Sequence, residues 1–474
     1  MKISGVFNSG IGGVLAILGF VSSIYVGINT PDFAGTDFYL LIPLAYAIMA
    51  LMCRDVFKYH EGSFGLKCFY IVSFVRYVLL PVYTCSTGTF AIRGHKSPPE
   101  AYIYAIIVSV LEVIVAFSVI KAYYPKIYKR QMLKKTKTTQ YYNDLGIGGF
   151  ILILFMIAIV VFRGHLNSII GTIRFLVVSE QFDMDADFWT YEIWAIQLFF
   201  AIITIVSTSY FMKREHRKSS LTNIIVPLIC AFFSCTLILT NNRMTMVYYA
   251  LCGLCILLTA FPKRSKLLSG VMIGSMLLVI VSFTLMKNFG IDATDYGGSQ
   301  VSEDEGASTI SAYVCGVENI AHSYDMFLIN GDKVGPMTIV SEVIRFFMLS
   351  RLPGMRPEFV NGVPTTVDLA TEGTEMVSVA GETLFWGTPY LGWFLDIIAV
   401  FIIVRFLVYF DVRTKLEDDL GRKYVYSWLS ILFGIFMCYC IQTLWNNVTY
   451  IPLLLTGALW VNRNIRIKKT VIRR

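Results

Sequence analysis

Long apolar runs dominate the pattern of hydrophobic and polar positions along the chain. Their length suits helices that cross the roughly 30 Å hydrocarbon layer of a bilayer, which takes about 17 to 25 residues. This pattern predicts an all-α polytopic membrane protein with about twelve transmembrane helices. The predicted spans are 11–28, 38–53, 66–86, 101–120, 146–162, 188–211, 223–240, 244–261, 267–286, 388–410, 424–443 and 448–462.

The distribution of Lys and Arg predicts the orientation of these helices. Only Lys2 precedes the first apolar run, and no small-residue cleavage pattern follows it, so we expect a retained helix. The richest basic stretches are Lys121–Lys137, Lys213–Lys218 and Arg463–Arg474, which all fall on one side of the predicted membrane. Because basic flanks stay in the cytoplasm, both termini are expected there.

Most connections between the predicted helices are short, and one long connection divides the chain into three parts. Residues 1–286 hold predicted helices 1–9, residues 287–387 form a large extracytoplasmic region, and residues 388–474 hold helices 10–12 and a basic tail. Carboxylates far outnumber cations in the middle part. Apolar residues recur there at helical spacing over 309–329 and 337–349, which predicts amphipathic helices packed on the membrane domain. One stripe comprises Val314, Val317, Ala321, Tyr324 and Phe327.

Composition narrows the class of protein. The chain of 474 residues is 56% hydrophobic and 15% charged, whereas soluble domains carry about 25% charged residues. The net charge of +8 is a sum over two compartments, and the basic tracts suit anionic lipid better than nucleic acid, so no nucleic-acid partner is expected. The signatures of soluble hydrolases, phosphate loops and dinucleotide folds are absent from the sequence.

A charged pair is predicted inside the membrane. Arg76 falls near the middle of the third span, where an unpaired cation costs several kcal/mol. Glu112 has a similar predicted depth in the antiparallel fourth span, so the two side chains are expected to meet. Arg76 then either closes a structural ion pair between helices or faces a substrate.

Further arginines are predicted at the outer face of the membrane. Arg243 lies in a short turn between two spans, and Arg345, Arg351 and Arg356 cluster in the acidic region. A guanidinium binds phosphate oxygens through two parallel hydrogen bonds, so these residues are candidates for a lipid diphosphate site. The alternatives are a lipid-headgroup anchor for Arg243 and a solvated surface for the others.

Two residues on the predicted outer side are candidates for general base catalysis. Glu382 precedes the tenth span, and His322 shares a helical face with Glu318. The alternatives are that Glu382 stabilises a helix N-terminus and that His322 is structural. No cluster of carboxylates or histidines suggests a metal site, so neither a metal nor another cofactor is expected.

These features together resemble a known family. The segment Val75–Pro81, the turn Asn242–Thr245, the external region and Gly381-Glu382 are similar to the Wzy-type O-antigen or capsular oligosaccharide repeat-unit polymerases. The resemblance implies a GT-C-like glycosyltransferase fold in the bacterial cytoplasmic (inner) membrane. It also implies substrates carried on undecaprenyl diphosphate, with a flippase and a chain-length regulator as partners.

The reaction implied by the resemblance moves the growing glycan from its lipid diphosphate to a sugar hydroxyl of an incoming repeat unit. Arg243, Arg345, Arg351 and Arg76 would stabilise the leaving diphosphate, and Glu382 or His322 would accept the hydroxyl proton. Two alternatives stay open: an O-antigen ligase with similar chemistry, and a flippase or transporter of lipid-linked oligosaccharide.

Overall fold

A computed structural model describes most of the predicted helices. It covers residues 4–30, 35–59, 63–88, 90, 96–135, 186–236, 243–275, 311, 314–330, 377–386, 389–449 and 452–461. No strand occurs in these ranges, so the described part of the chain is all-helical, as predicted. The expected span 146–162, the end of 267–286 and the expected helix 337–349 lie outside the described residues.

The helices follow the apolar runs closely. They are α1 (Ser4–Asn29), α2 (Leu41–Met52), η1 (Arg54–Lys58), α3 (Gly65–Phe74), η2 (Val75–Leu79), α4 (Leu80–Thr87), α5 (Pro99–Lys135), α8 (Ala186–Arg217), α9 (Thr222–Thr236), α10 (Arg243–Ala260), η3 (Pro262–Arg264), α13 (Val317–Asn330), α16 (Val379–Trp386), α17 (Pro389–Leu416), α18 (Leu420–Gly434), η6 (Phe436–Cys438) and α19 (Ile441–Thr449). Residues 265–275 and 452–461 are also helical.

Four helical segments in the described ranges are long and apolar enough to cross a membrane. They are Gly10–Asn29, Gly65–Thr87, Pro99–Leu133 and Leu391–Leu416. A bent pair, Val247–Ala260 and Pro262–Ser275, meets at 116° and makes a fifth if it counts as one span. Each of the four coincides with a run predicted from the sequence.

The outer faces of these helices are apolar. Along α1 the exposed residues recur every three or four positions, at Val14, Ile17, Val21, Ile24 and Ile28. Along α17 the same spacing exposes Leu391, Phe394, Ile398, Ile402 and Phe406. Soluble monomers rarely expose continuous apolar stripes of this length, whereas lipid covers them without cost. The fold therefore defines an α-helical, membrane-embedded protein.

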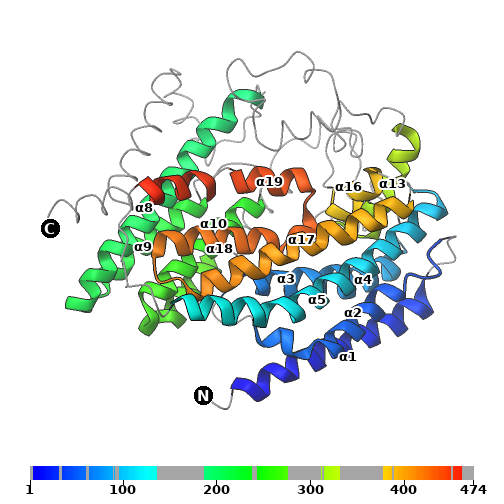
Figure 1. The fold of residues 1–474 in the computed structure, drawn as a ribbon, viewed down its shortest axis with the longest axis horizontal. Coiled ribbons are helices and arrows are strands. Elements are labelled where there is room, and N and C mark those ends of the chain that lie inside the picture. The colour runs from blue at the N-terminus through cyan, green and yellow to red at the C-terminus, as the bar shows by residue number, and fades with distance from the viewer. Residues whose placement is uncertain are drawn as a thin grey trace. The chain divides into compact units, whose positions relative to one another are not determined.

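The chain divides into two compact units, which do not follow chain order. The first comprises Met1–Leu133, Ser299–Val412 and Ser430–Asn447, and the second comprises Lys134–Gly298, Arg413–Leu429 and Val448–Arg474. In the first unit, α1, α2, α5 and α17 run alongside one another, and α13 and α16 lie where α5 and α17 begin (Figure 1).

Close backbone contact fixes the centre of the first unit. A Cβ atom on Gly65 would lie within 2.6 Å of the Ser430 carbonyl oxygen, and one on Gly434 within 2.3 Å of the Gly65 carbonyl oxygen. Asp411 of α17 links α3 and α18 at this contact. Its Oδ1 accepts hydrogen bonds from the Leu66 N–H at 3.1 Å and from the Ser430 hydroxyl at 3.2 Å. Small residues thus let helices approach closely, as membrane helices require.

The predicted amphipathic helix over 309–329 is interrupted: Ser311 and Val314 are helical, and a break at Cys315 and Gly316 separates them from α13. Cys315 has a left-handed φ of 52°, and the Gly316 N–H donates to the Ser311 carbonyl oxygen at 3.0 Å. This hydrogen-bond pattern ends a helical turn, so α13 begins only at Val317. Val317, Ala321 and Tyr324 of the predicted stripe are buried, which confirms that this face packs on the protein.

The second unit contains α8, α9 and α10. Glu215 near the end of α8 accepts hydrogen bonds from the Ser219 hydroxyl, the Asn223 amide and the Ser220 N–H, and these bonds lower its pKa to about 2. The ionised carboxylate thereby holds the α8–α9 turn. Deeper in this unit, Trp428 stacks on Tyr248 with ring centroids 5.3 Å apart.

One predicted span is wrong. The run 424–443 does not form one helix, because α18 ends at Gly434, η6 makes a single turn, and α19 starts afresh at Ile441. Tyr439, between them, is extended. Hydropathy cannot detect this break, since every residue from Ile435 to Cys440 is itself apolar.

Candidate functional site

The helix that carries Arg76 is locally widened. Within the continuous apolar segment Gly65–Thr87, η2 is a π-helical turn in which the Leu80 N–H donates to the Val75 carbonyl oxygen. Pro81 follows immediately and has no N–H for the Tyr77 carbonyl, so the regular α-helical pattern is interrupted here. The Ser22 hydroxyl of α1 donates to the Val78 carbonyl oxygen at 2.9 Å. Such π-turns often mark functional positions.

Arg76 and Glu112 form the predicted ion pair. The Arg76 Nη2 atom lies 3.0 Å from Glu112 Oε2, and the side chains are 2% and 0% exposed. The Tyr77 hydroxyl donates to the same carboxylate oxygen at 2.6 Å, and the guanidinium lies over the Tyr77 ring, 5.3 Å from its centroid. The structure confirms that the two residues meet, and burial of both charges makes each dependent on the other.

A second contact of the Arg76 guanidinium stabilises the break between α18 and α19. Arg76 Nη1 donates to the Met437 carbonyl oxygen at 2.7 Å. Met437 belongs to η6, where the backbone has left the helix that ended at Gly434. Non-helical backbone in a membrane protein must find partners within the protein, and a cation at the carbonyl end of a helix also favours its dipole.

Glu382 accepts a hydrogen bond from the backbone on the other side of this break, at the start of α19. This residue of α16 is fully buried, and its Oε2 accepts the N–H of Ile441, the first residue of α19, at 2.6 Å. The Cys440 Sγ atom caps the same turn through the Thr443 N–H at 3.4 Å. Arg76 therefore binds the carbonyl end of the interrupted helix, and Glu382 binds the N–H end where the helix resumes. The dipole of each helix end favours the charge that it meets. Helix stabilisation by Glu382 was one of the two roles that the sequence left open, although for a different helix.

Asp396 adds a second buried carboxylate to this region. It lies in α17, is 0% exposed, and interacts electrostatically with both Glu112 and Arg76. In the described part of the chain no hydrogen-bond donor reaches either of its side-chain oxygens. Sequence reasoning missed this residue, although a lone carboxylate within an apolar span is the same signal that pointed to Arg76.

A third buried carboxylate anchors α13. The Glu318 side chain is 2% exposed, and its two oxygens accept the Tyr39 hydroxyl at 3.3 Å and the Ser311 hydroxyl at 2.8 Å. Burial raises the pKa of Glu318 above its ordinary value of 4.5, and the hydrogen bonds from Ser311 and Tyr39 only partly offset it. Gly316 has no room for a side chain here, because a Cβ would lie 2.6 Å from Glu318 Oε2.

This carboxylate gives the protein a pH dependence of known sign. Folded Glu318 holds its proton more tightly than the unfolded chain, so its contribution to stability is complete below pH 4.5 and falls as the pH rises towards the raised value. Glu318→Gln, which stays neutral, should flatten this decline in the melting temperature in detergent between pH 4 and 7. Equal slopes in the variant and in wild type would contradict the assignment.

The two proposed bases lie on helices that pack together. Ser323 of α13 lies so close to Gly381 of α16 that a Cβ there would meet the Ser323 Oγ at 2.7 Å, and Phe327 packs edge-on against Phe385. Tyr324 contacts Tyr104 of α5, with ring centroids 5.0 Å apart. His322, one turn after Glu318, is half-buried on this helix pair. The predicted docking of α13 on the membrane helices is therefore confirmed.

Of the other arginines predicted to bind a diphosphate, the structure describes only the backbone of one. Arg243 is the first residue of α10, in the second unit, and its side chain is outside the described atoms. Arg345, Arg351 and Arg356 lie outside the described residues. Their proposed contact with a diphosphate stays a prediction.

Nothing in the described ranges gathers three His, Cys, Asp or Glu side chains as a metal site would. Comparison of the chain with family models, with curated proteins and with solved structures finds no match in any of the three. The class of protein therefore rests on the helices, their apolar faces and the buried charges within them.

Proposed function

We propose that this membrane protein is a polymerase that joins undecaprenyl-diphosphate-linked oligosaccharide repeat units into O-antigen, capsular or exopolysaccharide chains. It acts at the external face of the bacterial cytoplasmic membrane, with both termini in the cytoplasm. The resemblance to Wzy-type polymerases supplies the substrate class. The observation that carries the proposal is the packing of α13 on α16 over the start of α5, which brings together two helices of the predicted external region.

In the proposed reaction the acceptor sugar hydroxyl attacks the anomeric carbon of the donor glycan. The bond from that carbon to the diphosphate oxygen breaks, its electron pair leaves on undecaprenyl diphosphate, and the hydroxyl proton passes to a base. His322 is the better acceptor of that proton, because it is only half-buried and an imidazole nitrogen can accept and release a proton. Glu382, fully buried and committed to the Ile441 N–H, is a positioning residue.

The start of α10 supports a role for Arg243 with an anion. A cation at the first position of a helix opposes the helix dipole, which disfavours it by about 0.3–1 kcal/mol. An anion bound at this end would be attracted both by the guanidinium and by the positive end of the helix dipole. A diphosphate is the anion that the proposed reaction releases.

The proposal is tested by incubating the purified protein in detergent with synthetic lipid-linked repeat units, without nucleotide or ion gradient. We expect a ladder of lengthened glycans on gel electrophoresis and one released undecaprenyl diphosphate for each bond formed. A ligase would need a lipid A core acceptor and would give no ladder. Unchanged single units, from a protein that remains folded, would refute the polymerase.

The assigned roles of Glu382 and His322 predict different variant behaviour. Glu382→Gln keeps an oxygen that accepts the Ile441 N–H, so we expect lengthening within about threefold of wild type, whereas Glu382→Ala should lower both the rate and the melting temperature by loss of a helix cap. His322→Asn should lower kcat by about 10²-fold without a change in melting temperature.

The outcome for Glu382→Gln decides between its two roles. A loss as large in Glu382→Gln as in Glu382→Ala, with the fold intact, would make Glu382 the base and His322 structural.

A second candidate function has one observation in its favour. Asp396, buried beside the Arg76–Glu112 pair with no donor to its oxygens among the described residues, resembles the carboxylates that bind coupling ions in transporters. The protein would then move lipid-linked oligosaccharide across the membrane. Reconstituted vesicles with a proton or sodium gradient would show gradient-driven movement of single units, abolished by Asp396→Asn, and no ladder.

A further inference from the structure

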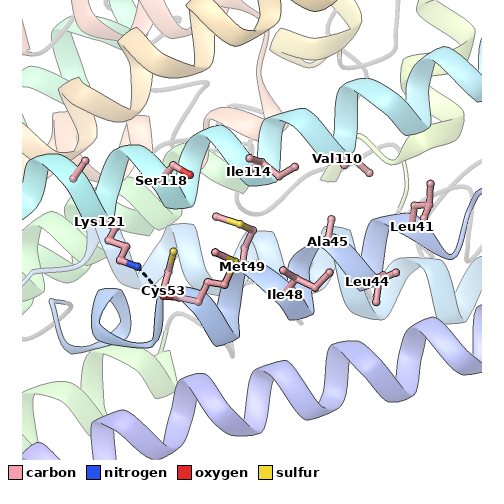
Figure 2. Close-up of a pocket in the computed structure, with 12 residues that line it drawn as sticks. Leu41, Leu44, Ala45, Ile48, Met49, Cys53, Val110, Ile114, Ser118 and Lys121 are labelled. Carbon is pink, nitrogen blue, oxygen red and sulfur yellow. Dashed lines mark hydrogen bonds between the residues drawn. The ribbon is translucent and has the colours of Figure 1, made fainter.

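An open groove between α2 and α5 faces outward from the first unit. It has a volume of about 800 Å³ and is lined by residues 41–53, which are α2 and the residue after it, and by residues 110–122 of α5. Figure 2 shows the side chains of both helices along it. Its floor is buried, with Ala45 at 9%, Met49 at 7% and Cys53 at 3% exposure, while its rim residues Ile48, Met52 and Ile114 are exposed.

The length of the groove matches one leaflet of a bilayer. The lining residues extend over about twelve positions of each helix, which at about 1.5 Å per residue is about 18 Å. Half of the hydrocarbon layer is about 15 Å thick. A single acyl chain standing in its leaflet would fill the groove from end to end.

One end of the groove is cationic. Among the described residues, Lys121 is the only charged one that lines it. Its Nζ donates to the Met52 carbonyl oxygen at 2.9 Å (Figure 2). An ammonium has three donors, of which Met52 takes one. Arg54 and Lys126 are exposed close by in the chain, so the Lys121 end attracts an anion.

Stacked aromatic rings mark the same end as a membrane interface. Tyr59 and Tyr124 stack with centroids 4.3 Å apart and an interplanar angle of 3°, and the Tyr124 hydroxyl donates to the Tyr59 carbonyl oxygen. Tyrosines of this kind gather at headgroup level, beyond which the chain becomes basic. Lys121 therefore stands where the phosphate of a lipid lies.

We propose that this groove is a binding site for one anionic phospholipid of the leaflet on the Lys121 side. One acyl chain lies along Ala45, Met49 and Ile114, and the phosphate pairs with Lys121. Neutral lipid would fill the apolar part but lose the charge pairing. This site is separate from the polymerase chemistry and does not depend on it.

The site is tested by native mass spectrometry of the full chain, purified from bilayers that contain phosphatidylglycerol and phosphatidylcholine in equal amounts. We expect one retained phosphatidylglycerol in wild type. Lys121→Gln should weaken its retention by about fivefold, and Ser118→Trp, which fills the groove from its exposed rim, should abolish it. Lys266→Gln, with the same charge change at an exposed residue that does not line the groove, should retain it.

Three outcomes would overturn the assignment. Phosphatidylcholine retained as firmly as phosphatidylglycerol would remove the headgroup contact. Equal retention in all three variants would place the lipid elsewhere. A dimer of the chain in place of a retained lipid, lost in Ser118→Trp, would make the groove a protein interface.

Discussion

Arg243→Ala is expected to lower the rate of glycan lengthening by at least about 10²-fold while the protein still inserts and folds. In the proposed reaction, undecaprenyl diphosphate gains charge as the glycosidic bond breaks, and removal of one preorganised charged donor from such a site typically costs about 10²–10³ in rate. Arg243→Lys should recover only part of this, because an ammonium cannot pair with two phosphate oxygens at once. Single-turnover lengthening of a labelled repeat unit measures the effect.

The control for Arg243 is Arg217→Ala, which removes an exposed arginine from the end of α8 in the same unit. Its rate should equal that of wild type. Full lengthening in Arg243→Ala would exclude this residue from the reaction, and an equal loss in both variants would indicate a general effect of charge.

Arg76→Ala is expected to cause the largest loss of stability in the described part of the chain, about 3–5 kcal/mol. It leaves the Glu112 carboxylate buried without its cation and the Met437 carbonyl without its donor. Arg76→Lys should be only a partial rescue, because a lysine ammonium cannot reach both partners with the same planar geometry. Unfolding in detergent, followed by thermal scanning, measures the difference.

A double-mutant cycle separates the ion pair from the broken helix. Glu112→Gln in the Arg76→Ala background removes the orphaned charge and should recover roughly half of the lost stability, and the remainder reports the Met437 contact. Additive losses from the two substitutions would mean that the pair is not coupled, against the 3.0 Å contact in the structure.

The sequence predicted the parts of this fold that hydropathy and charge determine. Four apolar runs became helices able to span a membrane, and the depths of Arg76 and Glu112 in adjacent antiparallel spans were enough to pair them. The amphipathic stripe of α13 also predicted its buried face, because a period of 3.6 residues leaves little choice of which side packs.

The predictions that the structure corrects concern positions where the backbone leaves the helix. The apolar segment from Ile435 to Cys440 predicts a continuous helix. In the structure, Arg76 donates a hydrogen bond to the Met437 carbonyl oxygen and Glu382 accepts one from the Ile441 N–H, and the helix is interrupted between them. Likewise the helix predicted over 309–329 is interrupted before Val317, because Cys315 adopts a left-handed conformation that no local propensity for cysteine would suggest.

The orientation of α13 tests the central claim most directly, because the proposed polymerase requires α13 and α16 to face the external side of the membrane. Asn330→Cys at the end of α13 and Lys129→Cys in α5 can each be treated with a membrane-impermeant maleimide in intact cells with a permeabilised outer membrane. We expect Asn330→Cys to react in intact cells and Lys129→Cys to react only after the cells are broken. The reverse pattern would place His322 and Glu382 in the cytoplasm and contradict the proposed polymerase.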